Sequence, residues 1–344
     1  MIEAASNDPR AAARTAWTRA ALADDRAEPV RASMDAGFRS YWRAQSADGS
    51  RIVMDSPPDK EDVRPWLHIR DLLEAGGVRV PRVLAQDVEA GFLLLEDLGA
   101  ETYLHVIDAG NADALFDDAV TQLLRIQAIA PPADLPAYDE AMLARELRLF
   151  DEWFCGRHLG MALDCGDMET LDGAYRVLID AALAQPQVLV HRDFMPRNLM
   201  PVGSGPANDG PAVLDFQDAV RGPIAYDALS LFKDAFLSWP EHRVDAWLDR
   251  YHVRAVDAGL PVPPLAQFRR DADLIGVQRH LKVIGIFARL HHRDGKPKYL
   301  ADVPRFLAYL DAVLPKYPEL AGLQRFIEHK VKPEIARLAA VVRE

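Results

Sequence analysis

Three oxygen-bearing side chains in the middle of the chain stand at spacings that suit phosphoryl transfer. The apolar run VLV is followed by the tripeptide HRD, which ends in Asp193, and Asn198 stands five residues further on. A second apolar run, AVL, ends in Asp215. Phosphoryl transfer needs a carboxylate that orients the attacking hydroxyl and accepts its proton, together with oxygen ligands for Mg²⁺. We therefore predict Asp193 as the catalytic residue and Asn198 with Asp215 as the magnesium ligands.

The residues around Asp193 are predicted to have supporting roles. His191 and Arg192 are expected to hold the loop rather than to react. Arg197 lies inside the loop and is expected either to contact phosphate or substrate or to form a structural ion pair. Asp227, in the string IAYDALSL, is predicted to begin a helix and to hydrogen-bond back to the loop.

Composition and charge exclude several classes of protein. The 344 residues are enough for two domains, and contents of 49% hydrophobic and 27% charged residues are ordinary for a globular protein. The net charge of −12 argues against general binding to nucleic acid or to an anionic membrane surface. No apolar stretch reaches the roughly 18 to 20 residues that span a bilayer, and the first residues do not resemble a secretory signal. The two cysteines form no CxxC pair that would indicate a zinc site. A cytoplasmic protein, by default a monomer, is expected.

The elements that must position the predicted site fall into two groups. A helix is predicted after Pro9, and aromatic residues that alternate with small ones indicate a hairpin with its turn at Asp48 and Gly49. After Gly99 the pattern changes to helical periodicity. The first group continues with a third strand at 52–54, a helix at 63–74 and strands at 80–84 and 91–95. The second group contains helices at 112–130, 141–158 and 171–184, with further helices after Ala225.

This order of elements predicts an α+β fold with two lobes. The N-terminal lobe, residues 1–98, is predicted to hold a five-stranded sheet, one helix and the additional N-terminal helix. The C-terminal lobe, residues 99–344, is predicted to be larger and mainly helical, and to carry the catalytic loop. The boundary is placed near Asp97 to Ala100, where the strand pattern ends.

The motifs HRDFMPRN and LDFQDAVRGPIAYDALSL resemble those of the aminoglycoside-phosphotransferase family of small-molecule kinases. The resemblance covers nearly the whole chain and implies a bilobal fold like that of protein kinases, with DFQ in place of their DFG. It also implies ATP and Mg²⁺ as cofactors, with ATP bound between the lobes. The residues that it assigns to ATP are Ser33, Met34, Asp35, Ala36 and Gly37 over the phosphates, Arg43 and Val53 on the sheet, and Glu96 and Leu98 at the adenine edge.

One departure from the family concerns the cation that holds the α- and β-phosphates. Such enzymes usually place a Lys or Arg on the third strand and pair it with a Glu on the following helix. This sequence has Asp55 and Trp66 at the corresponding positions. The absence of both the strand cation and its acidic partner is easier to explain than the absence of one, because a lone buried charge would be costly. Arg39, Arg43 and Arg51 are the alternative cations.

The segment RHLKVIGIFARLHHRDGKPKY, residues 279–299, is locally basic in an acidic chain. A solvated helix face followed by a basic loop would explain it. Alternatively, some of its cations reach an anionic or polar acceptor, whereas an enzyme for polycationic aminoglycosides would need carboxylates there. The residues predicted to bind the acceptor are Asp193, Arg197, Asp218, Arg279, His280 and Lys282.

The strings VMDSPP, GFLLLEDLG and QRHLKVIGIFARLHHRDGKPKYL, with those above, resemble one bacterial subgroup of the family. Its members phosphorylate the anomeric hydroxyl of N-acetylmuramate and N-acetylglucosamine, and Asp55 matches that subgroup. The resemblance implies recycling of cell-wall sugars, which bypasses de novo synthesis and its inhibition by fosfomycin. The alternatives are a kinase of another small alcohol (an amino alcohol, amino acid or antibiotic) and a nucleotide-binding pseudokinase scaffold. The missing strand cation is the only support for a scaffold, and the intact site residues oppose it.

Overall fold

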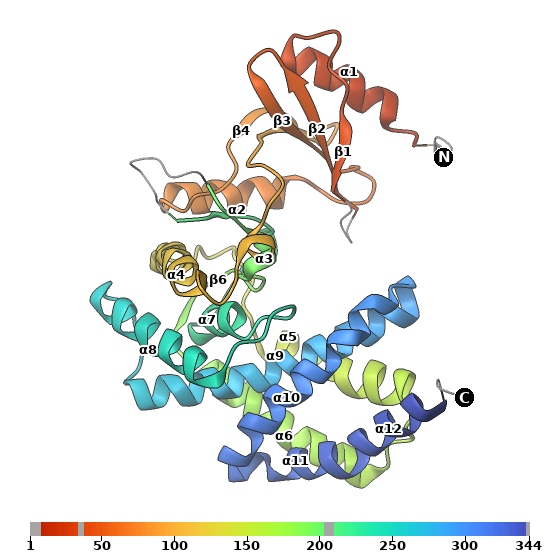
Figure 1. Ribbon diagram of the computed structural model, residues 1–344, viewed down its shortest axis with the longest axis vertical. Coiled ribbons are helices and arrows are strands. Elements are labelled where there is room, and N and C mark those ends of the chain that lie inside the picture. The colour runs from red at the N-terminus through yellow and green to blue at the C-terminus, as the bar shows by residue number, and fades with distance from the viewer. Residues whose placement is uncertain (1–7, 34–37, 203–209, 342–344) are drawn as a thin grey trace. The chain divides into compact units, whose positions relative to one another are not determined.

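The computed structural model describes residues 8–33, 38–202 and 210–341, and the chain forms two compact units (Figure 1). The first unit comprises residues 1–106 and 197–217, and the second comprises residues 107–196 and 218–344. The segment with Asn198 and Asp215 therefore packs with the first unit, whereas Asp193 belongs to the second. The predicted α+β fold, with a five-stranded sheet and a helical majority, is confirmed.

The first unit is built on an antiparallel sheet with the strand order β1-β2-β3-β5-β4. Strands β2 and β3 meet in the predicted tight turn, where Gly49 adopts a φ of 102° that favours glycine. Strand β4 begins at Val83, three residues later than predicted. Pro81 explains the difference, because proline has no N–H to donate to a neighbouring strand. The strands are β1 (Val30–Ser33), β2 (Ser40–Ser46), β3 (Gly49–Asp55), β4 (Val83–Asp87) and β5 (Phe92–Glu96), and the helices are α1 (Ala11–Leu22), α2 (Arg64–Ala75) and α3 (Tyr103–Val106).

Asp55, the acid that stands where the family has a cation, anchors helix α1 to the sheet. Its carboxylate is only 2% exposed and accepts hydrogen bonds from Arg10 Nε and Arg14 Nη1, each at 2.8 Å. The Arg14 guanidinium also lies 3.5 Å from the ring centroid of Trp42 on β2. Trp66 on α2, in place of the acidic partner, packs against Phe216 of the DFQ string with 5.1 Å between ring centroids. The charge reversal at Asp55 is therefore neutralised within this unit.

We predict that Asp55→Asn destabilises the first unit by about 3–5 kcal/mol, because breaking a buried ion pair leaves its partner poorly compensated. The buried Arg14 would keep only its 2.6 Å ion pair with Asp8. Chemical denaturation followed by a probe of the first unit measures this loss. The matched control is Asp59→Asn, whose exposed carboxylate makes only a 3.5 Å contact with Lys60. That change is expected to stay within about 0.5 kcal/mol. Equal stability of the two variants would contradict the assignment.

The second unit is mainly helical, and the 30-residue helix α9 runs through it (Figure 1). It packs against α5, α6, α7 and α10. Its major elements are α4 (Ala112–Ala128), α5 (Glu140–Leu149), the π-helical turn η1 (Phe150–His158), α6 (Cys165–Ala184), α7 (Ala225–Phe232), α8 (Glu241–Asp257), α9 (Leu265–Asp294), α10 (Val303–Val313), α11 (Ala321–Phe326) and α12 (Lys332–Val341). Short turns η3 to η6 connect the last helices, and strands β6 (Gln187–Val190) and β9 (Val220–Pro223) pair antiparallel.

Helix α6 begins at Cys165, six residues before the predicted start at Leu171. The cause is a capping box: the Asp164 carboxylate accepts from Asp167 N at 2.9 Å, and Asp164 N donates to Asp167 Oδ2 at 3.3 Å. The predicted helix 141–158 is likewise divided, because its second half winds as η1.

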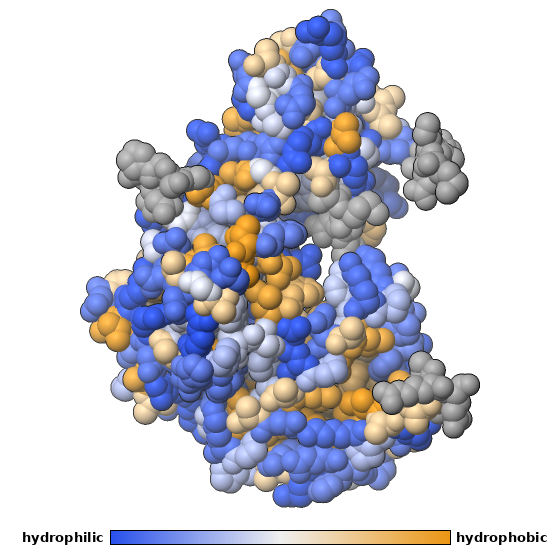
Figure 2. Space-filling view, viewed as in Figure 1, coloured by the Kyte–Doolittle hydropathy of each residue, from blue (hydrophilic) through white to orange (hydrophobic). Residues whose placement is uncertain are grey.

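The surface and the core follow the usual division between polar and apolar side chains. On the face shown in Figure 2 hydrophilic residues predominate, with smaller groups of apolar residues between them. The exposed large apolar side chains include Val30, Leu183 and Val253, which belong to different elements. Within residues 8–33, 38–202 and 210–341, none of the helices combines the length and the apolar character needed to cross a membrane.

Candidate active site

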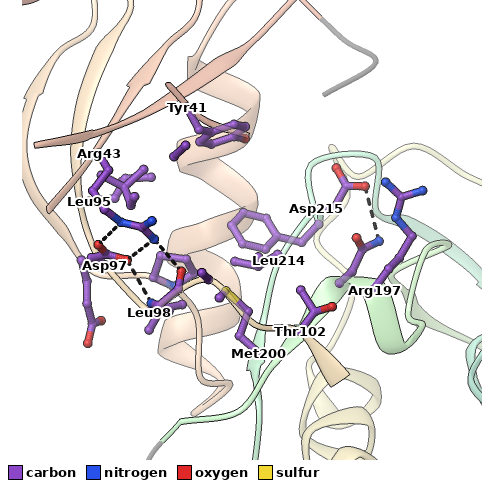
Figure 3. A pocket seen from close by; sticks show the side chains of 18 of the residues that line it. Tyr41, Arg43, Leu95, Asp97, Leu98, Thr102, Arg197, Met200, Leu214 and Asp215 are labelled. Carbon is purple, nitrogen blue, oxygen red and sulfur yellow. Dashed lines mark hydrogen bonds and ion pairs between the residues drawn. The ribbon is translucent and has the colours of Figure 1, made fainter. Parts of the chain in front are cut away.

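A cavity of about 310 Å³ lies within the first unit (Figure 3). One part of its wall comes from the sheet and from the segment that follows β5. The other part comes from residues 197–216, where the short strands β7 (Leu199–Met200) and β8 (Ala212–Val213) pair. Apolar side chains cover much of the wall, which suits a planar heteroaromatic group. They include Ile52, Trp66, Leu95, Leu98, Met200, Leu214 and Phe216.

The segment after β5 is fixed by Asp97 and Arg43. The Asp97 carboxylate accepts from Arg43 Nε at 2.6 Å, from Gly99 N at 2.9 Å and from the Ser50 hydroxyl. Arg43 Nη2 also donates to Gly99 O at 2.8 Å, as Figure 3 shows. Burial acts to raise the pKa of Asp97, but the hydrogen bonds from Arg43 and Ser50 outweigh it and lower the pKa. Arg43 thus lines the cavity while it holds the segment in place.

The two residues predicted at the adenine edge, Glu96 and Leu98, both line this cavity. The Glu96 side chain pairs with Arg79 at 2.6 Å and with Arg82 at 3.3 Å, and its N–H donates to the carbonyl of Arg82. The Leu98 side chain contributes to the apolar wall.

Val53, predicted on the nucleotide side, is fully buried on the other face of the sheet. Consecutive strand residues point to opposite faces, so its neighbour Ile52 lines the cavity instead. Ser33 ends β1, and Met34, Asp35, Ala36 and Gly37 lie outside the described residues. The other two candidate cations are held elsewhere. Arg39 pairs with Glu61 at 3.1 Å, and Arg51 donates to the backbone carbonyls of Asp48 and Ser50.

The predicted magnesium ligands are brought together by the β7–β8 pair. Leu214 N donates to Asn198 O at 2.9 Å, and Asn198 Nδ2 lies 3.4 Å from Asp215 Oδ2. Asp215 adopts a φ of 63°, a left-handed conformation that is uncommon outside glycine and that recurs at functional sites. An amide oxygen beside a carboxylate is a hard donor set of the kind that Mg²⁺ prefers, so these residues fit the ion.

The catalytic loop, in the second unit, is held by Asp227. As predicted, Asp227 lies in the first turn of α7 and accepts from His191 N at 2.7 Å and from Arg192 N at 3.0 Å. Arg192 has a φ of 74°, and Asp193 N donates to His191 Nδ1 at 3.2 Å. The fully buried carboxylate therefore fixes the backbone just before Asp193.

We predict a pH-dependent contribution of Asp227 to stability. Burial raises the pKa of Asp227 to about 6, and the two N–H groups oppose that shift only in part. The unfolded chain releases this proton near about pH 4, so the stability that Asp227 contributes is full below pH 4 and is lost as the pH rises through 6. The free energy of unfolding of the wild type minus that of Asp227→Asn should fall by roughly 3 kcal/mol over this window. If the free energies of unfolding of the wild type and of Asp227→Asn change in parallel between pH 4 and pH 7, this prediction is wrong.

A buried network that the sequence did not disclose lies behind the catalytic loop. Glu146 on α5 is 7% exposed and accepts from Arg192 Nη2 at 2.5 Å, from Lys282 Nζ at 2.8 Å and from the Tyr138 hydroxyl. Gln278 donates to both Tyr138 and Glu146. Burial acts to raise the pKa of Glu146, but Lys282 and Arg192 lower it. Both cations also interact electrostatically with Asp193.

The predicted acceptor residues divide between the two units. Arg197 lines the cavity of the first unit. In the second unit, the exposed Asp218 accepts from Arg192 through its carbonyl, and Lys282 belongs to the Glu146 network. Arg279 and His280 are 2% and 1% exposed, so the interpretation as a solvated helix face is wrong for them.

His280 is held by rings rather than by hydrogen bonds. It stacks on Tyr309 with 4.9 Å between ring centroids and also contacts Phe306. Within the described part of the chain neither of its ring nitrogens has a hydrogen-bond partner. Burial, with the nearby Lys233 and Arg279, holds its pKa well below the ordinary value, so the ring is neutral. Its role in acceptor binding stays a prediction.

Known phosphotransferases are similar to this chain over most of its length. Residues 29–262 match the phosphotransferase enzyme family. The N-acetylmuramate/N-acetylglucosamine kinase of Pseudomonas aeruginosa is 54% identical over 298 residues, which cover 86% of this chain and 87% of that protein. The kinase of the same name from Neisseria meningitidis is 44% identical over 309 residues, 88% of this chain and 90% of that one. Among solved structures, the ADP-bound aminoglycoside phosphotransferase APH(2'')-Ib superposes with a TM-score of 0.58 at 17% identity, covering 87% of this chain and 97% of that chain, which supports the fold.

Proposed function

Since the chain belongs to the phosphotransferase enzyme family, we propose that it phosphorylates the anomeric hydroxyl of N-acetylmuramate and N-acetylglucosamine with ATP, giving the sugar 1-phosphates. The observation that carries this proposal is the 54% identity, over most of both chains, to a kinase named for these two sugars. The Asp193 loop and the Asn198–Asp215 pair support it, because they supply the groups that such a transfer needs. The products would enter the recycling of cell-wall sugars.

The catalytic step is assigned to Asp193. It would orient the C1 hydroxyl and accept its proton as the bond from C1 oxygen to the γ-phosphorus forms, while the bond from that phosphorus to the bridging oxygen breaks and ADP leaves. An anomeric hydroxyl is more acidic than an ordinary alcohol, so a carboxylate can accept its proton late in the reaction. Asp227 would hold the loop that carries Asp193, and positioning of the reactants would supply most of the rate.

The nucleotide is assigned to the cavity of the first unit, with its base between the β5 side and Leu214 and Phe216. Glu96 and Leu98 would face its edge through backbone atoms. Asn198 and Asp215 would hold Mg²⁺, which when bound neutralises charge on the phosphate oxygens. Arg43 would keep the segment after β5 in the shape that receives the base.

A screen with labelled ATP tests the acceptor. N-acetylmuramate, N-acetylglucosamine, homoserine and kanamycin are offered separately, and transfer to the two amino sugars is the expected result. An anomeric phosphate has no reducing end and releases its phosphate in mild acid, whereas a phosphate on an ordinary alcohol survives. Transfer only to homoserine or kanamycin, or an acid-stable sugar phosphate, would refute the proposed substrate class. Absence of transfer to every acceptor would favour a scaffold.

A further inference from the structure

Three histidines that have no part in the phosphoryl-transfer site converge in the second unit. His158 is the last residue of η1, and His291 and His292 lie in the last turn of α9. One ring nitrogen from each lies within 4.8 Å of the other two. His158 Nδ1 lies 3.3 Å from His292 Nε2, across 134 residues of chain.

The packing of η1 on α9 fixes this arrangement. Gly285 on α9 makes the approach possible, since a Cβ at this position would lie 2.3 Å from the carbonyl carbon of Leu149, just before η1. The His158 ring stacks on Phe154, with 5.6 Å between centroids. The π-helical winding of η1 is a feature that often marks functional sites. The three imidazoles are therefore held by the fold rather than gathered by chance on flexible side chains.

The geometry suits a shared ion. Imidazole nitrogens bind Zn²⁺ at about 2.0–2.1 Å in tetrahedral sites, which places two such nitrogens roughly 3.3–3.4 Å apart. The observed 3.3 Å agrees with that spacing. His291 Nδ1 is also buried and has no hydrogen-bond partner within the described residues. The nitrogens of the remaining pairs lie within 4.8 Å of one another, so they must approach by at most roughly 1.5 Å to share one ion.

The surroundings of the three histidines contain groups that attract a cation and groups that repel one. His158 is the last residue of η1, and His291 and His292 lie in the last turn of α9. The carbonyl ends of helices attract positive charge. Arg157 and Arg293 lie nearby, but Arg293 is neutralised by Asp294 at 2.7 Å. Imidazole binds a metal ion through its neutral form.

We propose that His158, His291 and His292 form a site for a transition-metal dication of the Zn²⁺ class, with water as the fourth ligand. Imidazole ligands select Zn²⁺, Ni²⁺, Co²⁺ or Cu²⁺ over Mg²⁺, so this site is chemically distinct from the Asn198–Asp215 pair. The bound ion joins the end of η1 to the end of α9, the helix that also carries Lys282. The sequence contains the adjacent pair of histidines, but nothing in it connects them to His158.

Co²⁺ binding to the full-length, tag-free protein after removal of metal tests the site. One equivalent of Co²⁺ should give the intense visible absorption of a four-coordinate nitrogen site, and Zn²⁺ should displace it. His292→Ala is the main variant, because this side chain is exposed and its loss should leave the fold intact. Removal of a residue that merely supports a ligand costs 10–100-fold in affinity, so loss of a ligand should cost at least about 100-fold.

Two control variants make the outcome specific. His329→Ala removes an exposed histidine elsewhere on the second unit and should bind Co²⁺ as the unmodified protein does. Asp215→Asn removes a predicted magnesium ligand and should also retain the absorption. The proposal is overturned by weak, six-coordinate absorption in the unmodified protein, by a band that survives in His292→Ala, or by a band that is lost in Asp215→Asn. None of these outcomes bears on the kinase activity.

Discussion

Replacement of Asp193 by Asn is expected to lower kcat by about 10²–10⁴-fold, the usual contribution of a positioned general base. The amide keeps the size of the side chain but cannot accept the proton of the sugar hydroxyl. The KM for ATP should stay nearly unchanged, because the residues assigned to the nucleotide belong to the first unit and Asp193 to the second. Steady-state kinetics with N-acetylglucosamine measures both constants.

The control for this variant is Glu169→Gln, an exposed carboxylate on α6. It should turn over as the wild type does, and thermal melting should show that both variants are folded. Turnover by Asp193→Asn equal to that of the wild type would falsify its assignment as the proton acceptor. A rise in the KM for ATP without loss of kcat would place Asp193 at the nucleotide instead.

Replacement of Asp215 by Asn is expected to lower kcat by about 10²–10³-fold, the loss that follows removal of one preorganised electrostatic contact in other enzymes. The variant should also need a higher Mg²⁺ concentration for half-maximal activity, because one charged oxygen ligand is gone. Titration of activity with Mg²⁺ at fixed ATP measures the shift. Asp193→Asn serves as its counterpart, since it should lose rate with no change in the Mg²⁺ requirement. An unchanged Mg²⁺ requirement in Asp215→Asn would remove it from the ligand set.

The parts of the fold that were predictable are those with local signals. Alternating strands, the glycine turn at Gly49 and helical periodicity gave the five-stranded sheet and most helices, and the family resemblance is confirmed by the match over residues 29–262. Asp193 and Asp215 were predicted as site residues because each follows a short apolar run, and Asn198 because it stands five residues after Asp193. The first turn of α6 was missed because its cap uses Asp167 where a Glu or Gln is the usual sign.

The features that escaped prediction depend on contacts between distant segments. Glu146 is one of many helical glutamates, and only the folded chain brings it to Arg192 and Lys282. The reversed charge at Asp55 was recognised, but its partners in α1 were not. Val53 was predicted at the nucleotide, whereas its neighbour Ile52 lines the cavity, because consecutive strand residues point to opposite faces of the sheet.

The ion pairs of Asp55 bear on how this protein can be trimmed or recombined. The region that matches the family begins at residue 29, whereas both guanidinium groups that neutralise Asp55 come from residues 10 and 14. A fragment that begins at the family boundary would lack both guanidinium groups that neutralise Asp55 at the end of β3. A chimera that exchanges this lobe with that of a relative must therefore keep α1 and the preceding Arg10 together with β3.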